Sequence, residues 1–223
     1  MQILVMKWED IYKRSKIYLY CGDLPKQRIE YTKKNFVGLS LIYSDKYHIK
    51  HDINNRFNVN DNSVDIVQSE DVMEHIEYDK LTPIINDIHR ILKVGGLFRL
   101  SVPDYMCDLL QARSLKDASG DIYFDPGGGG GWDANRVVDN GHLWFPTYHS
   151  VKQLLEKTHF RVSYKFLHYY EGQEAHIYPI DYSLGYIHRT PDNDKRVQDP
   201  RRPLSLVVDC IKEVPSQLPT LTT

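Results

Sequence analysis

The sequence predicts an α/β fold built on an open, mostly parallel sheet, and the segment 60–105 carries most of the evidence. An apolar run, Val64–Val67, precedes a helical pattern whose apolar residues recur every three or four positions as far as Leu92. Lys93–Gly96 ends that pattern, and a second apolar run follows at Leu97–Val102. Strand, helix, glycine turn and strand form one βαβ unit. Such crossovers are nearly always right-handed, so the two strands lie parallel in one sheet.

Acidic residues follow both strands of this unit. Glu70 and Asp71 come after the first strand, and Asp104 comes after the second. Open parallel sheets bind ligands just beyond the carboxyl ends of their strands. The unit therefore predicts a ligand site as well as a fold.

Three shorter strands are expected before the βαβ unit. Lys16–Cys21 alternates weakly and ends at a Gly-Asp turn, Phe36–Ile42 is a buried run, and Tyr47–Ile53 is a short third strand. The charged segment that starts at Pro25 is expected to form one or two helical turns between the first two strands.

The second half of the chain alternates short elements with long polar segments. We expect a single domain over residues 1–223, with a Gly-rich insertion at 118–146, a polar insertion at 170–203 and a disordered tail beyond Val214. The regular elements of this half are a short helix in Asp104–Lys116, an amphipathic helix at Tyr148–Lys157, a strand at Phe160–Tyr169 and a last strand at Leu204–Lys212.

Composition places the chain among soluble cytoplasmic proteins. Its 223 residues suffice for one sizeable core, and the formal net charge of −2 gives no basic field that would favour nucleic acid or an acidic membrane. Three cysteines without CxxC spacing fit a reducing compartment. No run approaches the length of a membrane span or a signal peptide. We therefore expect a small-molecule partner rather than nucleic acid or membrane, and composition leaves a homo-oligomer open.

Five consecutive glycines, Gly127–Gly131, stand inside the first insertion. Glycine visits most backbone conformations, so the run fits a surface excursion. It fits equally the hinge of a flap, Ala118–Pro146, that carries Trp132 and His142 over the site. A phosphate-binding loop is excluded because no strand precedes the run and no Gly-Lys-Ser/Thr follows it.

Five motifs occur in a fixed order along the chain: His51–Ile53, Asp61–Asp65, Glu74–Ile76, Asn86–Gly96 and Val102–Tyr105. In this order they resemble the class I S-adenosylmethionine-dependent methyltransferases, and most closely a small bacterial branch of predicted methyltransferases. The resemblance covers about a third of the chain. It implies a Rossmann-like open sheet, mostly parallel with an antiparallel last strand and helices on both faces. It also implies S-adenosylmethionine as the cofactor.

The resemblance places the cofactor at the ends of the strands, but one side of that site departs from the family. Cys21–Asp23 stands where the family has a glycine-rich turn, and Ser40 aligns with the acid that holds both ribose hydroxyls. Serine is not a two-oxygen charged acceptor, whereas Asp52 matches the position that faces the adenine amino group. The implied cofactor contacts are Cys21, Gly22, Asp23, Ser40, Asp52, Ile53, Ser69, Glu70, Asp71 and His75.

Transfer of a methyl group to oxygen usually requires a base, and histidine suits that role near neutral pH. His75 belongs to the Glu-His pair that flanks the cofactor cleft in the family, although a structural role at a helix start fits it equally. His142 and His149 flank an aromatic stretch in a region that often contacts substrate in related folds. The histidine spacings contain no tight ligand set, so no metal site is expected. The residues expected to contact substrate are Asp104, Tyr105, Trp132, Trp144, Tyr148, His176 and Arg189.

Three hypotheses about function remain at this stage. The first is S-adenosylmethionine-dependent methyl transfer to a small-molecule or glycan-linked acceptor at oxygen. The second is a methyltransferase-like binding protein whose eroded cofactor site no longer supports catalysis. The third is a nucleotide-sugar-modifying enzyme that uses different chemistry on a similar sheet.

Overall fold

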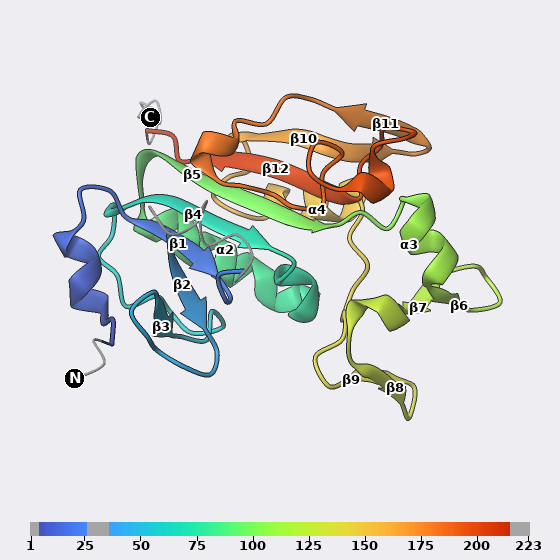
Figure 1. Ribbon diagram of the computed structural model, residues 1–223, viewed down its shortest axis with the longest axis horizontal. Helices are drawn as coiled ribbons and strands as arrows, with labels where there is room; N and C mark the ends of the chain where they lie inside the picture. Colours follow the sequence, from blue (N-terminus) through green and yellow to red (C-terminus); the bar gives the residue numbers. More distant parts are fainter. Residues whose placement is uncertain (1–4, 26–35, 215–223) are drawn as a thin grey trace, which may run out of the picture.

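The computed structural model describes residues 5–25 and 36–214, and an eight-stranded sheet forms its centre (Figure 1). The strand order is β11-β10-β12-β5-β4-β1-β2-β3. The run from β3 to β5 is parallel, whereas β12 is antiparallel to both β5 and β10. The predicted α/β sheet with an antiparallel last strand is confirmed. The strands are β1 (Tyr18–Cys21), β2 (Phe36–Ser40), β3 (His48–Lys50), β4 (Val64–Glu70), β5 (Leu92–Pro103), β10 (Tyr164–Glu171), β11 (Glu174–Ile177) and β12 (Ser205–Ile211).

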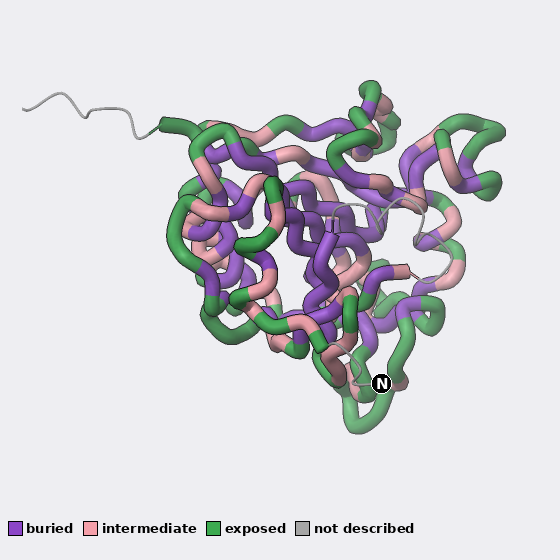
Figure 2. The backbone as a smooth tube through the Cα atoms, turned by 60° about the vertical axis from the view of Figure 1, so that its left-hand side comes forward, coloured by how far each residue is buried: buried purple, intermediate pink, exposed green. Residues whose placement is uncertain are grey.

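Two amphipathic helices cover one face of this sheet. They are α2 (Tyr78–Ile91) and α4 (Tyr148–Glu156), the two that apolar periodicity predicted. Thr147 caps α4, because its side chain accepts a hydrogen bond from the Ser150 backbone N–H. Figure 2 shows the buried chain concentrated in the middle of the molecule. The apolar side chains of α2 that lie there are Leu81, Ile84, Ile85, Ile88 and Ile91.

The polar insertion covers the opposite face of the sheet through a segment that contains the short 3-10 helix η5 (Tyr182–Leu184). Arg99 on β5 is completely buried beneath it. Its Nη1 donates to the carbonyl oxygens of Asp181 (2.9 Å) and Gly185 (2.7 Å), and its guanidinium pairs with both carboxylate oxygens of Asp209 on β12. One buried cation therefore fastens the insertion to two strands.

The Gly-rich insertion has regular structure that periodicity did not predict. It projects from the end of β5 as a series of short turns and hairpins, at the lower right of Figure 1. Within it, a Cβ added at Gly128 would lie 2.7 Å from the His142 ring, so the glycine run allows the chain to pack closely there. Its elements are β7 (Ile122–Phe124), η4 (Pro126–Gly128), β8 (Gly131–Asp133) and β9 (Arg136–Val138). Before it lie β6 (Leu115–Lys116) and α3 (Asp108–Arg113), and α3 confirms the short helix expected within Asp104–Lys116.

Some boundaries differ from the sequence prediction. The strand expected from Phe160 begins only at Tyr164, because a turn closed by the Ser163 N–H and the Phe160 carbonyl (2.8 Å) comes first. The strand β5 begins directly after α2 and runs through the glycine turn that was expected to precede it. The helical turns expected after Pro25 and the tail beyond Val214 lie outside the described residues. Over 5–25 and 36–214, no helix has both the length and the apolar character needed to cross a membrane.

A buried histidine predicts how acid affects stability. His168 on β10 is fully buried, its Nε2 lies 3.0 Å from the Tyr178 carbonyl oxygen, and burial lowers its pKa from 6.5 to about 4. Between these two pKa values the unfolded chain binds the proton and the folded chain does not. The stability therefore falls as the pH decreases through this window, by up to about 3 kcal/mol.

The measurement compares His168→Gln with the unsubstituted chain by denaturant unfolding at pH 7.5 and pH 4.5. We expect the variant to be less stable at pH 7.5 and to lose less stability on acidification. Equal losses in the two proteins would mean that His168 titrates alike in the folded and unfolded states.

Candidate active site

A cavity of about 520 Å³ lies beyond the carboxyl ends of β1, β2 and β4, where the strand rule places a ligand. Its volume falls within the range of small-molecule sites. Cys21, Ser69 and Glu70 do not line it. The predicted cofactor positions that do are Gly22, Asp23, Ser40, Asp52, Ile53, Asp71 and His75.

Gly22 forms the floor of the cavity where β1 ends. Its φ of +97° is a conformation that other residues rarely adopt, and its backbone N–H and carbonyl both bond to Leu39 at 3.1 Å. A Cβ added at Gly22 would lie 3.2 Å from the Val72 side chain. This single glycine therefore lets the chain turn at the end of β1 and pack closely on Val72, and the family's glycine-rich turn is reduced to one residue.

Ser40 and Asp52 line the adjoining wall and are both bonded locally. The Ser40 Oγ accepts from the backbone N–H groups of Ile42 (3.3 Å) and Tyr43 (3.4 Å). Asp52 Oδ1 accepts from the backbone N–H and the side-chain amide of Asn54, both at 2.9 Å. These bonds fix the two side chains at the edge of the cavity.

We expect Asp52→Ala to weaken binding of S-adenosylmethionine more than Ser40→Ala does. Loss of a carboxylate that accepts hydrogen bonds changes binding by about 1–3 kcal/mol, and loss of one hydroxyl changes it by about 1 kcal/mol. Calorimetric titration of both variants is the measurement. Equal losses, or a larger loss at Ser40, would contradict the assignment of Asp52 to the adenine side.

Two acidic residues at the end of β4, Glu70 and Asp71, bind the polar insertion beside the cavity. Glu70 Oε1 accepts from the His188 backbone N–H at 2.6 Å, and its Oε2 lies 3.3 Å from the Tyr20 hydroxyl. Asp71, at φ +55°, lines the cavity and forms an ion pair with Arg189 at 3.1 Å. Arg189, predicted to contact substrate, thus lies at the cavity edge and is paired with an acid.

A second group of polar residues lies where the Gly-rich insertion returns to the short 3-10 helix η3 (Met73–His75). The Leu143 N–H donates to the Glu74 carbonyl at 2.8 Å, and the Trp144 indole N–H donates to the Met73 carbonyl at 2.9 Å. These bonds hold the end of the insertion on η3. They bring His142 Nε2 to 3.8 Å from Glu74 Oε1.

Burial dominates the electrostatics of this group. Glu74 is completely buried, and burial together with the nearby Asp71 charge raises its pKa well above the ordinary value. Burial also lowers the pKa of His142 to about 3, assisted by the charge of His75. Both shifts favour the neutral forms of Glu74 and His142. These two side chains lie where several proton-accepting atoms converge.

Three further residues extend from His142 away from the cavity. The Tyr105 hydroxyl lies 2.5 Å from His142 Nδ1 and donates to Asp125 Oδ2 at 2.5 Å. Arg113 pairs with the same carboxylate at 2.6 Å. Burial by itself would raise the pKa of Asp125. The hydrogen bonds from Arg113 and Tyr105 outweigh this effect, so the pKa of Asp125 is lowered. Burial, followed by the hydrogen bond to Asp125, raises the pKa of Tyr105.

The remaining residues that were predicted to contact substrate or act as the base lie away from the cavity. Asp104 is buried and accepts from the backbone N–H groups of Met106 and Tyr170, which fixes the loop after β5. The others do not line the cavity. They are His149, exposed on α4; Trp132, exposed beside Tyr123; Trp144, packed on Tyr78; and Tyr148 and His176, both stacked on Tyr169.

Sequence reasoning missed Arg113, Asp125 and Asn140, of which Asn140 lines the cavity. Arg113 ends the short helix α3, and the other two belong to the Gly-rich insertion, where periodicity gives no register. The one available signal was Asp125 before Pro126, since an acid followed by proline commonly starts a turn, and Asp125 does cap η4.

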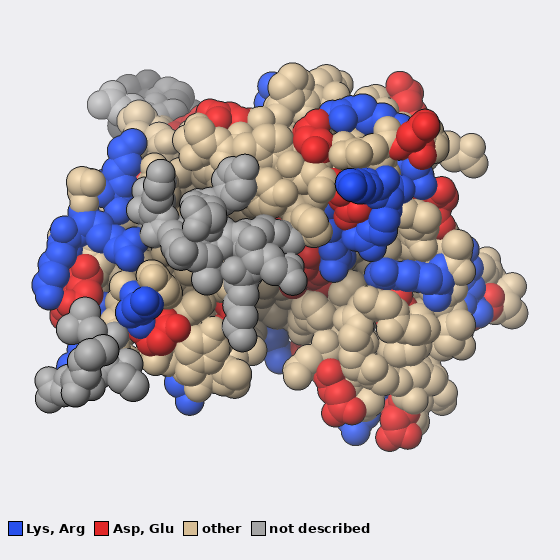
Figure 3. All heavy atoms as spheres, in the orientation of Figure 1, with Lys and Arg blue, Asp and Glu red and all other residues tan. Residues whose placement is uncertain are grey.

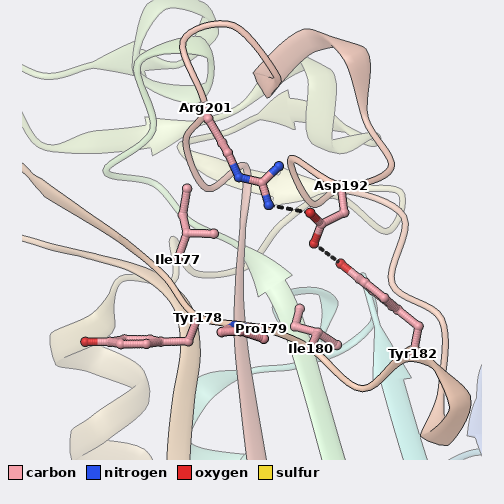
Figure 4. Close-up of a pocket in the computed structure, with 7 residues that line it drawn as sticks. All are labelled: Ile177, Tyr178, Pro179, Ile180, Tyr182, Asp192 and Arg201. Carbon is pink, nitrogen blue, oxygen red and sulfur yellow. Dashed lines mark hydrogen bonds and ion pairs between the residues drawn. The ribbon is translucent and has the colours of Figure 1, made fainter.

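Another cavity, of about 600 Å³, lies in the polar insertion (Figure 4). Its polar side chains satisfy one another: Arg201 pairs with Asp192, which also accepts from the Tyr182 hydroxyl at 2.7 Å. The face shown in Figure 3 likewise carries acidic and basic side chains close together. Of these two cavities, the one at the strand ends is the better site for a ligand.

Comparisons with known proteins agree with this geometry. A family model described as a methyltransferase domain matches residues 13–165. Three solved structures of S-adenosylmethionine-dependent methyltransferases share the fold. That from Archaeoglobus fulgidus is 13% identical, with TM-score 0.53 and coverage of 92% of this chain and 90% of the other. The structure from Methanosarcina mazei is 12% identical, with TM-score 0.52 and coverage of 95% of this chain and 100% of the other. The structure from Clostridium acetobutylicum is 11% identical, with TM-score 0.51 and coverage of 93% of this chain and 91% of the other.

At these identities the structural likeness shows the fold alone, and the family model carries the assignment. A comparison with curated proteins gave no match. The cofactor implied by the family fits the cavity, because the cavity has a suitable volume and a glycine floor at the end of β1. The chain therefore belongs to the class I S-adenosylmethionine-dependent methyltransferases.

Proposed function

We propose that the protein transfers the methyl group of S-adenosylmethionine to an oxygen atom of a small-molecule or glycan-linked acceptor. Gly22, Asp52 and Asp71 would hold the cofactor in the cavity at the strand ends. The cofactor supplies a methyl group on a sulfonium, and displacement leaves the C–S electron pair on sulfur as the new C–O bond forms. The side chains of the protein must orient the acceptor and enable the removal of its hydroxyl proton.

The observation that carries the proposal is the position of Glu74, His75 and His142 relative to the cavity. One ligand atom from each lies within 4.8 Å of the other two. His75 also lines the cavity, so the group adjoins the space assigned to the cofactor. An oxygen nucleophile must lose a proton. In the group formed by Glu74, His75 and His142, side chains that can accept a proton lie beside the cavity assigned to the cofactor. Hydroxyl acceptors therefore fit better than thiols, which ionise more readily unaided.

The size and charge of the site support a small or terminal acceptor. The chain carries a net charge of −2, and its arginines near the site are paired with acids, as at Arg189 and Arg113. A polyanionic acceptor would need unpaired basic side chains along its path. A neutral hydroxyl compound or the end of a glycan needs none.

The test is an assay with methyl-labelled S-adenosylmethionine and matched panels of hydroxyl, amine and thiol acceptors, the hydroxyl panel including free sugars and phenols. We expect label in hydroxyl compounds, recovered as ethers that resist mild alkali. Label confined to amines or thiols would refute the choice of oxygen.

A binding protein without turnover is the second candidate, and Ser40 favours it because its hydroxyl bonds within its own turn. The two candidates share cofactor binding, so thermal melting with cofactor is expected to show stabilisation in either case. A ligand present at 100 times its dissociation constant stabilises by about 2.7 kcal/mol. Stabilisation by cofactor without label transfer to any acceptor would favour the binding protein.

A further inference from the structure

Glu74, His75 and His142 have the composition of a transition-metal site. One carboxylate and two imidazoles form a set that binds divalent first-row metals and leaves coordination positions open. The first two residues belong to η3, and the third comes from the end of the Gly-rich insertion, so the fold brings them together although the sequence separates them. Histidine spacing along the chain therefore gave no sign of this group.

The hydrogen bonds of the two histidines leave their Nε2 atoms as acceptors. His75 Nδ1 lies 2.8 Å from the Asn140 carbonyl oxygen, which only accepts, so Nδ1 carries the proton. The Tyr105 hydroxyl donates to the ionised Asp125, so its oxygen accepts from His142 Nδ1. Metal-binding histidines characteristically have Nδ1–H fixed in this way by a carbonyl or a carboxylate network.

Glu74 adds an independent observation. Its side chain is completely buried, and neither carboxylate oxygen has a hydrogen-bond partner among the described residues. An unpaired buried polar group destabilises a protein by about 1–3 kcal/mol, and a charged one by more. His142 Nε2 lies 3.8 Å from Glu74 Oε1, which is beyond hydrogen-bond distance, and it holds a lone pair in this tautomer.

We propose that Glu74, His75 and His142 bind one divalent transition-metal ion, such as Zn²⁺ or Mn²⁺, at the edge of the cofactor cavity. The ion satisfies both unpaired carboxylate oxygens and both Nε2 lone pairs at once. Coordination bonds of about 2.0–2.2 Å would draw the three ligand atoms inward from their present separation. Because His75 lines the cavity, an ion bound to its imidazole would lie beside that space.

This site gives the proposed function a means of activating the acceptor, and in that respect it rests on the proposed function. A hydroxyl bound to the ion at an open position loses its proton to solvent more readily, and its oxygen then attacks the methyl group. The metal keeps its oxidation state, since methyl transfer exchanges a C–S bond for a C–O bond. Acceptors with two adjacent oxygens, such as catechols or vicinal diols, would use two open positions.

The experiment measures metal binding without cofactor or acceptor, so its outcome is independent of methyl transfer. Chelator-treated protein is titrated with Zn²⁺ and, separately, with Mn²⁺ by calorimetry. We expect one ion per chain for at least one metal, and at least a tenfold weaker affinity in Glu74→Gln, His75→Gln and His142→Gln. His149→Gln, which removes an exposed histidine on α4, is the matched control and is expected to bind as the unsubstituted chain does.

A further variant tests the positioning of His142. Tyr105→Phe leaves all three ligands in place but removes the hydroxyl that fixes the imidazole tautomer, so we expect a 10–100-fold weaker metal affinity. Circular dichroism spectra and thermal melting without ligand verify that each variant is folded. Absence of binding by both metals, or the same affinity in His149→Gln and the ligand variants, would overturn the metal site. Either result would leave S-adenosylmethionine binding and methyl transfer to be judged by their own assays.

Discussion

Arg99→Met is expected to lower the free energy of unfolding by about 3–5 kcal/mol. The guanidinium is completely buried and joins four oxygen atoms: both carboxylate oxygens of Asp209 and the carbonyls of Asp181 and Gly185. Methionine has a comparable shape but no donors. The substitution therefore leaves a carboxylate and two carbonyls without these bonds in a place with little access to water.

The matched control is Arg196→Met, which removes an arginine of the polar insertion that Arg99 binds. Arg196 also pairs with an acid, Asp194 at 2.6 Å, but 56% of its side chain is exposed. Because the head group of Arg196 is largely solvated, we expect its removal to cost less than that of Arg99, although Asp194 itself is buried. Denaturant unfolding monitored by circular dichroism measures both variants. Similar small losses in the two would show that water or rearrangement satisfies the groups that Arg99 leaves behind.

His142→Gln is expected to reduce methyl transfer by about 10²–10⁴-fold, while the affinity for S-adenosylmethionine stays unchanged. His142 is buried between Glu74 and Tyr105 and does not line the cofactor cavity, so its loss affects the acceptor side. Rate constants from the labelled assay and calorimetric titration of the cofactor measure the two effects separately.

His149→Gln is the comparison for this prediction as well. His142 and His149 stand seven positions apart in the sequence and were equal candidates from sequence. The structure separates them, because His149 is exposed on α4. We expect its replacement to leave both the rate and the cofactor affinity unchanged. A loss of rate at His149 that equals the loss at His142 would place the acceptor on α4 instead.

The elements that the sequence pattern could predict were those that pack on the core, either along one helix face or on both faces of a central strand. The helix α2 has apolar residues every three or four positions, and the strands β4 and β5 contain apolar runs. Sequence reasoning located α2 and β4 to within a few residues, whereas β5 begins five residues before the expected Leu97. The region from Ala118 to Pro146 has no such pattern, because its short hairpins pack on a few aromatic side chains rather than on the core. Local hydrogen bonds and close glycine contacts order it, and these leave no period in a sequence.

The candidate site divides in the same way. Gly22, Ser40 and Asp52 were predicted from their places at strand ends, and the structure brings them to one cavity. The convergence of Glu74 with His142 was not predicted, because it depends on how the Gly-rich insertion returns to η3. Sequence spacing reports neighbours along a helix or strand, whereas this pair is set by the path of a long insertion.

The division of the cluster between η3 and the Gly-rich insertion has an evolutionary consequence. The insertion contributes His142, Asn140 and Asp125, and the common sheet contributes the cofactor cavity. Exchange of this one segment between related enzymes would replace the proposed acceptor side of the site and would change the lining of the cofactor cavity only at Asn140. Acceptor preference in this lineage can therefore diversify by recombination of a single contiguous stretch of the gene.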